Sequence, residues 1–88
     1  MKKAFFKGKI VPFGSAKIGI MTHAFNYGTG VFEGIRGYWN KGKNQMFILK
    51  LNEHYERLLR SALSVKIILK YSLEELSNIT IEIGRAHV

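Results

Sequence analysis

The sequence predicts an α+β fold in which two β-hairpins precede two helices. Three observations lead to this class. Two short apolar runs flank a Lys-Gly-Lys turn near the N-terminus, and a second pair of runs flanks a polar, glycine-containing turn. Beyond about residue 50, apolar residues recur with helical spacing instead of alternating. Hydrophobic types make up 47% of the 88 residues, so a packed domain is expected rather than a disordered chain.

The first hairpin is expected in residues 4–13, which read AFFKGKIVPF. Lys7-Gly8-Lys9 separates the two apolar runs, and Gly8 can take the positive φ that a tight hairpin turn requires. Residues 14–21 are then expected to form a connecting loop that leads into a brief strand.

The second hairpin is expected between residues 31 and 49. Residues 31–39, VFEGIRGYW, are rich in β-branched and aromatic types that favour strands. Residues 40–44, NKGKN, are typical of a turn, and residues 45–49, QMFIL, supply the returning strand.

The first long helix is predicted from an apolar face with helical spacing, formed by Tyr55, Leu58, Leu59, Ala62 and Val65. Asn52 is the expected N-cap. Glu53–Arg57 and Glu56–Arg60 are spaced as i, i+4 ion pairs with the acid on the favourable side.

A second helix is predicted to begin at Ser72, because Ser72 and Glu75 have the spacing of a capping box. The end of the chain reads differently: residues 83–88, IGRAHV, match the translation of a widely used sequencing adapter up to its stop codon. We therefore expect residues 1–82 to be the N-terminal part of a small domain and 83–88 to be a non-native tail. This tail would cut the helix after about two and a half turns, at 3.6 residues per turn.

The charge balance raises one alternative function. Fourteen basic residues face six glutamates, giving a net charge of +8, and a small basic nucleic-acid-binding domain could stack bases on exposed aromatic side chains. The candidates for stacking are Phe5, Phe6, Phe13 and Tyr38. Ten of the basic residues are lysines dispersed from Lys2 to Lys70, however, which is more typical of a solvated surface.

Several other classes of function are disfavoured by composition. The absence of cysteine excludes disulfides and thiolate metal sites and agrees with a cytoplasmic protein. His23 and His54 lack partners at ligand spacing, so no metal site is expected. No run approaches the roughly 20 apolar residues of a membrane span, so no membrane partner is expected.

The most unusual stretch is residues 27–38, YGTGVFEGIRGY, with four glycines in twelve positions. A dinucleotide fingerprint is rejected because Gly28, Gly30 and Gly34 are spaced one residue too widely, with no strand-forming run before them. A P-loop is rejected because no Gly-Lys-Ser/Thr closes the stretch.

Three motifs together resemble the branched-chain amino acid aminotransferases, a family of fold-type IV pyridoxal-phosphate enzymes. They are THA at 22–24, YGTGVFEGIR at 27–36 and EHYERL at 53–58, and the resemblance extends over residues 4 to about 81. Phe32-Glu33-Gly34 is its most discriminating part, because D-amino acid aminotransferases and aminodeoxychorismate lyases tend to have Glu-Thr where this chain has Glu33-Gly34. Phe25-Asn26 departs mildly from the commoner Leu-His of the family.

The resemblance implies roles for five residues. Phe32 and Gly34 would wall the cavity for an aliphatic side chain, and Tyr27 would contribute to the same pocket from the partner subunit. Arg57 would hold the phosphate of pyridoxal 5'-phosphate, although its spacing leaves an ion pair with Glu53 as the alternative. Arg36 would either orient groups near the pocket or pair with an acid such as Glu33.

The implied activity is transfer of an amino group between branched-chain L-amino acids (leucine, isoleucine or valine) and 2-oxoglutarate, by a homodimer or larger homo-oligomer. This chemistry needs a lysine that forms a Schiff base with the cofactor. None of the lysines between Lys2 and Lys70 matches the family context of that residue, which lies in the second domain. We therefore expect no catalytic residue in these 88 positions, and the fragment alone should be inactive.

Overall fold

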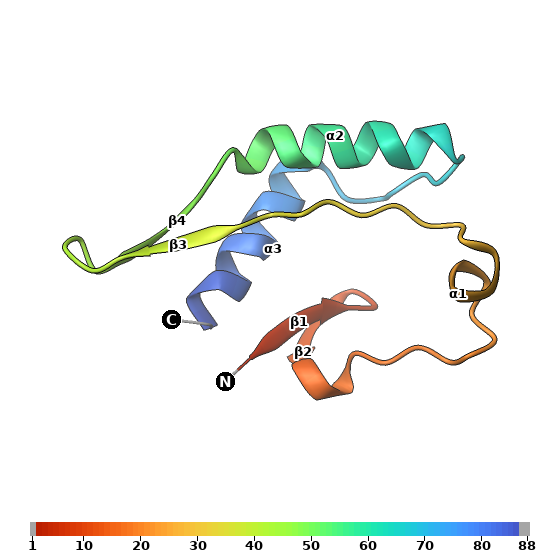
Figure 1. The fold of residues 1–88 in the computed structure, drawn as a ribbon, viewed down its shortest axis with the longest axis horizontal. Coiled ribbons are helices and arrows are strands. Elements are labelled where there is room, and N and C mark those ends of the chain that lie inside the picture. The colour runs from red at the N-terminus through yellow and green to blue at the C-terminus, as the bar shows by residue number, and fades with distance from the viewer. Residues whose placement is uncertain (1, 87–88) are drawn as a thin grey trace.

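A computed structural model describes residues 2–86; Met1, His87 and Val88 lie outside the described residues (Figure 1). The elements follow one another in the order β1 (Lys3–Phe6), β2 (Lys9–Pro12), a 3-10 turn (Phe13–Ser15), α1 (His23–Tyr27), β3 (Gly37–Asn40), β4 (Gln45–Ile48), α2 (Leu51–Ser64) and α3 (Leu73–Ala86). The two antiparallel hairpins are separate two-stranded sheets. The predicted α+β arrangement of two hairpins followed by two helices is therefore confirmed.

The first hairpin, β1–β2, forms because two consecutive residues take positive φ at its turn. Lys7 has φ 52° and Gly8 has φ 81°, which is the pattern of a type I′ hairpin turn. The register places Phe5 opposite Ile10. The prediction that Gly8 takes the positive-φ turn position is confirmed.

The second hairpin, β3–β4, is shorter on its first side than the sequence predicts. The turn lies at the expected place, and the Asn40 side-chain oxygen accepts a hydrogen bond of 2.9 Å from the amide of Lys43. The first strand begins only at Gly37, so the expectation of a strand throughout 31–39 is wrong. A Cβ on Gly37 would lie 2.8 Å from the sulfur of Met46, so a larger residue there would require the flexible Met46 side chain to shift.

Between the hairpins, the expected brief strand after residue 21 is replaced by the short helix α1. Gly28 ends this helix in the left-handed region, with φ 66°, and its amide donates to the carbonyl of Ala24 at 2.9 Å. A glycine just beyond the last helical residue is a common helix terminator, because it adopts this conformation without strain.

Helix α2 does not begin with the predicted cap. Lys50, in the left-handed conformation with φ 50°, is the N-cap and offers no side-chain hydrogen bond. Asn52 lies inside the helix, and its side-chain oxygen instead accepts a hydrogen bond of 3.2 Å from the hydroxyl of Ser77 on α3. The N-cap prediction was wrong because a tertiary partner takes the side chain that the local rule assigned to the cap.

Helix α3 begins with the predicted capping box. The Ser72 amide donates to a Glu75 carboxylate oxygen at 2.9 Å, and the Glu75 amide donates to the Ser72 hydroxyl at 3.1 Å. The helix does not end near residue 82 as expected; it continues through the first residues of the predicted tail to Ala86. That residues 83–88 are non-native stays a prediction.

The helices α2 and α3 pack through small and polar side chains. Ala62 and Ser77 are the buried residues of the described chain, with exposed fractions of 1% and 8%. The hydroxyls of Tyr55 and Thr80 are hydrogen-bonded at 2.5 Å and so join the two helices. Outside the helix pair, the ring of Phe5 on β1 packs edge-on to Tyr71. The described molecule is only 18 Å thick along its shortest axis, so it has little interior.

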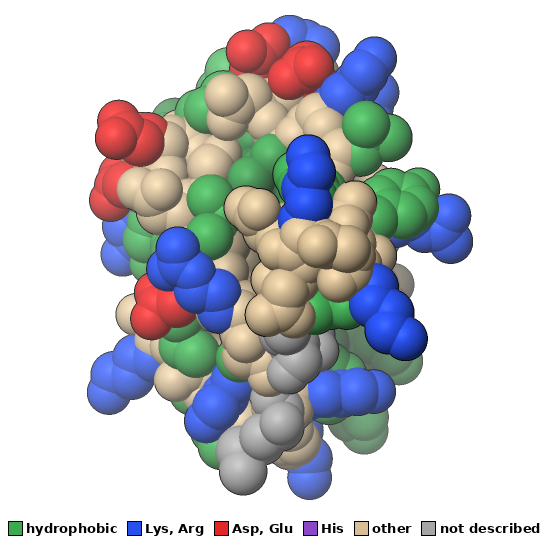
Figure 2. Space-filling view, turned by 90° about the vertical axis from the view of Figure 1, so that its left-hand side faces the viewer, with side chains coloured by type: hydrophobic (Ala, Val, Ile, Leu, Met, Phe, Trp, Pro, Cys, Tyr) green, Lys and Arg blue, Asp and Glu red, His purple; other side chains and the backbone are tan. Residues whose placement is uncertain are grey.

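Basic side chains are dispersed over the face of the molecule drawn in Figure 2. On the face drawn in Figure 2, Lys and Arg side chains are scattered among apolar and neutral ones instead of forming a stripe. Within residues 2–86, none of the helices combines the length and the apolar character needed to cross a bilayer. The picture agrees with the reading of the lysines as a solvated surface.

Candidate functional site

The centre of the candidate site is the stretch from residue 31 to residue 36, which runs beside α2 between α1 and β3 (Figure 1). Burial alternates along it: positions 31, 33 and 35 are half-buried, whereas Phe32, Gly34 and Arg36 are exposed. Phe32 has 91% of its surface exposed. A period of two is the spacing of an extended chain, whose side chains point to opposite sides in turn. Three of the implied substrate residues therefore share one outward edge, which we call the Phe32 edge (Phe32, Gly34 and Arg36).

The opposite side of the same stretch carries Glu33, whose carboxylate contacts two residues of α2. Arg57 Nε donates to Oε2 at 2.8 Å and Arg57 Nη2 donates to Oε1 at 2.5 Å. The guanidinium therefore binds the carboxylate through two parallel hydrogen bonds. His54 Nδ1 lies 2.7 Å from Oε1. We call these three residues the Glu33 cluster.

The proton positions in this cluster follow from the hydrogen-bonding capacity of each group. An ionised carboxylate only accepts, so the 2.7 Å contact requires His54 to carry its proton on Nδ1 and donate to Glu33. Arg57 Nη2 lies 3.2 Å from the same Nδ1, but two donors cannot bond to each other, so this contact is only proximity. Both α2 side chains therefore donate to one acidic group.

These donors keep Glu33 ionised. The side-chain hydrogen bond from Arg57, followed by that from His54, lowers the pKa of Glu33 from 4.5 to about 2. In return, the carboxylate raises the pKa of Arg57 above its ordinary value. The Glu33 side chain is only 10% exposed, so the charge lies at the inner side of the stretch, against the helix.

Arg57 has free hydrogen-bonding capacity on its other side. A guanidinium has five N–H donors, and Glu33 uses only one on Nε and one on Nη2. The remaining three donors belong to a side chain that is 58% exposed. A planar fork of this kind matches the oxygens of a phosphate group, so the arrangement fits the group that the sequence resemblance implies.

The sequence reasoning missed the partner of Arg57. The i, i+4 rule assigned it to Glu53, yet within residues 2–86 its acidic partner is Glu33, which is 24 residues away in the sequence. The second expected pair, Glu56–Arg60, is likewise not among the ion pairs of the described residues. The only sequence signal for the true pair was the presence of both residues in the motifs that carry the resemblance.

The other implied residues lie apart from the Glu33 cluster. Tyr27, 73% exposed, lies at the end of α1, where its ring is 4.7 Å from that of His23. His23 in turn hydrogen-bonds through Nδ1 to the hydroxyl of Thr29 at 2.6 Å. The guanidinium of Arg36 lies 5.9 Å from the ring centre of Tyr38, so Arg36 makes a cation–π contact and leaves Glu33 to Arg57.

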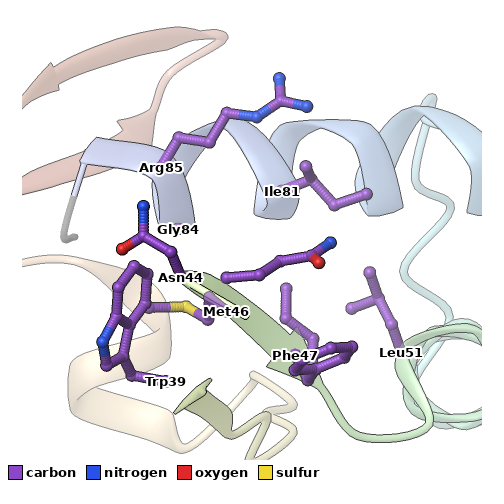
Figure 3. A pocket seen from close by; sticks show the side chains of 10 residues that line it. Trp39, Asn44, Met46, Phe47, Leu51, Ile81, Gly84 and Arg85 are labelled. Carbon is purple, nitrogen blue, oxygen red and sulfur yellow. The ribbon is translucent and has the colours of Figure 1, made fainter. Parts of the chain in front are cut away.

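A hollow lies elsewhere, between the β3–β4 hairpin and α3 (Figure 3). It has a volume of about 660 Å³, and its wall includes Trp39, Met46, Leu51 and Ile81. None of the residues implied by the resemblance lines it. Within residues 2–86, no group of three or more His, Cys, Asp or Glu residues could hold a metal ion. The chemistry of the candidate site therefore depends on the Glu33 cluster and the Phe32 edge.

Comparison with known proteins gives sequence relatives over almost the whole chain. The chain is 58% identical over 85 residues to a protein of Aquifex aeolicus described as a "Probable branched-chain-amino-acid aminotransferase"; the match covers 97% of the chain and 27% of that protein. It is 38% identical over 76 residues to a D-alanine aminotransferase of Staphylococcus aureus, which covers 86% of the chain and 25% of the relative. The chain thus spans about a quarter of the length of these relatives. No family model matches the sequence.

Solved structures agree with the sequence relatives. The fold superposes with a TM-score of 0.88 on a branched-chain aminotransferase of Thermoproteus uzoniensis solved with norvaline, at 41% identity over 97% of the chain and 28% of that structure. It superposes with a TM-score of 0.85 on the PLP form of the branched-chain amino acid aminotransferase from Thermobaculum terrenum, at 32% identity over 97% of the chain and 28% of that structure. The described fold is therefore that of the N-terminal region of fold-type IV aminotransferases.

Proposed function

Because the chain belongs to the branched-chain aminotransferase family, we propose that it forms the N-terminal region of a pyridoxal-phosphate-dependent transaminase. The complete protein would move the amino group between leucine, isoleucine or valine and 2-oxoglutarate. One observation carries this proposal: a single extended stretch presents the Phe32 edge outward while its other side holds Arg57, three of whose donors stay free.

Arg57 is the residue of this chain that would bind the cofactor. Its three free donors and its 58% exposed side chain suit it to hold the phosphate, which keeps the cofactor in a fixed place. Pyridoxal phosphate, when bound, supplies an electron sink for carbanion chemistry at the substrate Cα. The lysine that would take and return the proton belongs to the remainder of the protein.

The Phe32 edge would select the side chain of the substrate. Phe32 offers an apolar wall, and burial of an aliphatic side chain is worth about 25 cal/mol per Å² of surface removed from water. Gly34 leaves room, because nothing lies within 4 Å of the position that a Cβ would take. Arg36, held against Tyr38, would carry a positive charge at the same edge.

A second subunit would complete the pocket. Tyr27, which lies apart from the Glu33 cluster and is largely exposed, would contribute its ring to the pocket of the partner. The large apolar side chains exposed from Ile18 to Phe32 give such an assembly a surface to cover. We therefore propose a homodimer or a larger homo-oligomer for the complete protein.

The relative from S. aureus makes D-amino acid transamination the second candidate. Gly34 favours the branched-chain activity, because D-amino acid aminotransferases tend to have threonine at this place of the motif. A Cβ and its branches at position 34 would occupy part of the space beside Phe32 that the larger aliphatic substrates need.

A chimera tests the proposed function directly. Residues 4–81 would replace the matching region of the A. aeolicus aminotransferase, giving what we call the Aquifex chimera. We expect it to bind pyridoxal phosphate, as measured by absorbance, and to transaminate leucine with 2-oxoglutarate faster than it uses D-alanine. A folded chimera that binds no cofactor, or that prefers D-alanine, would contradict the proposal. The 88-residue chain by itself should show no transamination.

A further inference from the structure

Among the described residues, one side chain makes all the hydrogen bonds between the stretch 31–35 and the rest of the molecule, while Val31 and Ile35 are half-buried on the same side. The backbone of the stretch makes no backbone–backbone hydrogen bond with another described residue; the nearest such bonds involve Gly30 and Arg36. The side-chain hydrogen bonds of the stretch are those of the Glu33 carboxylate. The polar attachment of Phe32 and Gly34 to the rest of the described chain therefore runs through the residue between them.

The same carboxylate determines the direction of Arg57. Arginine has a long side chain with many rotamers, and an exposed arginine is ordinarily mobile. Here Glu33 binds the Nε edge and one Nη2 proton, so the plane of the guanidinium is fixed and its free donors point away from the carboxylate. The third bond, from His54, fixes the carboxylate in turn against α2.

We propose that Glu33 is a positioning residue that couples the two binding functions of this region: it orients Arg57 toward the cofactor phosphate and holds Phe32 and Gly34 as the wall of the substrate pocket. The inference rests on the proposed function, since it assigns Arg57 to the phosphate. It goes further because it makes cofactor affinity and aliphatic substrate affinity depend on one carboxylate that touches neither ligand.

The charge of Glu33 matters as much as its shape. Glutamine at this position would still accept from His54 or Arg57 through its amide oxygen, but its NH₂ group would face the other guanidinium donor. One of the two parallel hydrogen bonds would be lost, and Arg57 would regain rotational freedom. Aspartate would keep the charge but would be one methylene shorter, so it would reach α2 less well.

The test uses the Aquifex chimera with Glu33→Gln, Glu33→Asp and, as the charge-matched control, Glu56→Gln. Glu56 is exposed on the same helix as Arg57 and takes no part in the Glu33 cluster. Cofactor affinity is measured by absorbance titration with pyridoxal phosphate, and leucine use by steady-state kinetics. We expect Glu33→Gln to raise both the dissociation constant of the cofactor and the KM for leucine by about five- to tenfold, less than the loss of a charge-assisted hydrogen bond to the ligand itself, because Glu33 acts through other residues. Glu33→Asp should recover part of both, and the control should change neither.

A double variant separates positioning from general damage. If Glu33 acts on the phosphate through Arg57, then Glu33→Gln should weaken cofactor binding little further once Arg57→Ala is present. The leucine KM should still rise in that background, because the wall contains Phe32 and Gly34 rather than Arg57. Two full, additive losses of cofactor affinity would overturn the coupling.

The outcomes distinguish this inference from the function on which it rests. An unsubstituted chimera that neither binds the cofactor nor uses leucine contradicts the proposed function. A working chimera in which Glu33→Gln lowers the melting temperature yet leaves both binding constants unchanged overturns the inference, since Glu33 would then only stabilise the fold. If Glu33→Gln fails to fold, Glu33→Asp decides: unchanged constants in that variant overturn the inference, and a rise in both supports it.

Discussion

The pair of helices α2 and α3 and the segment from residue 16 to residue 36 are stabilised in opposite ways. Each helix buries one side chain, Ala62 on α2 and Ser77 on α3, and the two helices are joined by two side-chain hydrogen bonds, Asn52–Ser77 and Tyr55–Thr80. The segment has one helix of five residues and leaves large apolar side chains exposed, among them Ile18, Ile20, Met21, Phe25, Tyr27 and Phe32. The helices carry packing partners within this chain, whereas the segment leaves its large apolar side chains exposed among the described residues.

This difference indicates a division of roles. Regular packing keeps α2 in place, so that Arg57 and His54 have fixed positions on it. The segment, tied to that helix through Glu33, supplies the side chains that a ligand or another protein surface would contact. Binding residues are often carried by irregular segments that a rigid scaffold holds in position.

The largest expected effect is a loss of cofactor affinity when a side chain of α2 is changed. In the Aquifex chimera, Arg57→Ala should lower affinity for pyridoxal phosphate about ten- to a hundredfold, because it removes charge-assisted hydrogen bonds to the phosphate. Arg57→Lys should recover only part, since an ammonium keeps the charge but loses the fork. Absorbance titration measures both, and cofactor binding as tight as in the unsubstituted chimera would leave Arg57 only its ion pair with Glu33.

The matching change on the segment should affect the other ligand. Phe32→Ala in the same chimera should raise the KM for leucine about tenfold or more, because an exposed aromatic wall is truncated, while cofactor affinity changes little. Leucine kinetics alongside the same titration provide the measurement. If cofactor affinity fell together with leucine use, the two regions would not be separable by ligand.

A packing comparison should give the next largest effect. Ala62→Leu adds three carbons at a side chain that is only 1% exposed and should destabilise the 88-residue chain by about 1–3 kcal/mol, as overpacking does. Phe25→Ser, at a side chain that is 67% exposed, should change the stability of the chain by less than about 0.5 kcal/mol. Urea unfolding measures both, and repeating it in the chimera sharpens the contrast: Phe25→Ser should cost more there, because a second surface covers the segment.

The start of α3 offers a smaller, local effect. Ser72→Ala removes the hydroxyl that accepts from the Glu75 amide and should cost about 1 kcal/mol of stability. Glu74→Gln, in the same first turn but outside the capping box, is the control and should cost only a few tenths of a kcal/mol. Equal losses in the two variants would mean that charge, and not the reciprocal bonds, supports this helix.

The stability that Glu33 contributes by linking the segment to α2 should decrease at acidic pH. Because the pKa of Glu33 is lowered from 4.5 to about 2 in the folded chain, the unfolded chain binds more protons between these values. The stability that the ionised carboxylate contributes is complete above about pH 4.5 and is lost as the pH falls toward 2. The urea midpoint of unfolding should therefore rise with pH between pH 2 and 5. This dependence should be weaker in Glu33→Gln and unchanged in Glu56→Gln.

The smallest effect is expected at the end of the chain. If residues 83–88 are a non-native tail, as we propose, deleting them should change the free energy of unfolding by less than about 1 kcal/mol, the typical effect of one mutation. Gly84 and Arg85 border the hollow between β4 and α3, so the same deletion tests whether contacts around that hollow contribute to the free energy of unfolding. A larger loss would contradict the proposal.

The elements that could be predicted from the sequence are those with local causes. Gly8 takes positive φ without strain and so marks the hairpin turn, and Ser72 and Glu75 satisfy each other three residues apart. Asn52 and Arg57 could not be assigned correctly by such rules, because their partners, Ser77 and Glu33, lie 25 and 24 residues away. In each case the local rule predicted a hydrogen-bonding role close in the sequence, whereas in the fold the side chain bonds to a residue far away in the sequence.

The segment near the candidate site shows the same limit in its backbone. The β-branched and aromatic residues of 31–36 predicted a strand, and the alternation of burial that a strand would have is present. Strand assignment also needs a neighbouring backbone, however, and no backbone of the described chain pairs with this stretch. The side-chain pattern could be predicted, but the missing hydrogen-bonding partner could not.

Because burial alternates along residues 31–36, the number of residues in this stretch should matter more than the type of each residue. With a period of two, inserting or deleting one residue between Gly30 and Glu33 would exchange the inward and outward positions, so that the carboxylate faced outward and an apolar side chain faced Arg57. Most irregular connections tolerate changes in length. Here a single-residue insertion or deletion should be more damaging than most substitutions, although residues 31–36 contain no regular secondary structure.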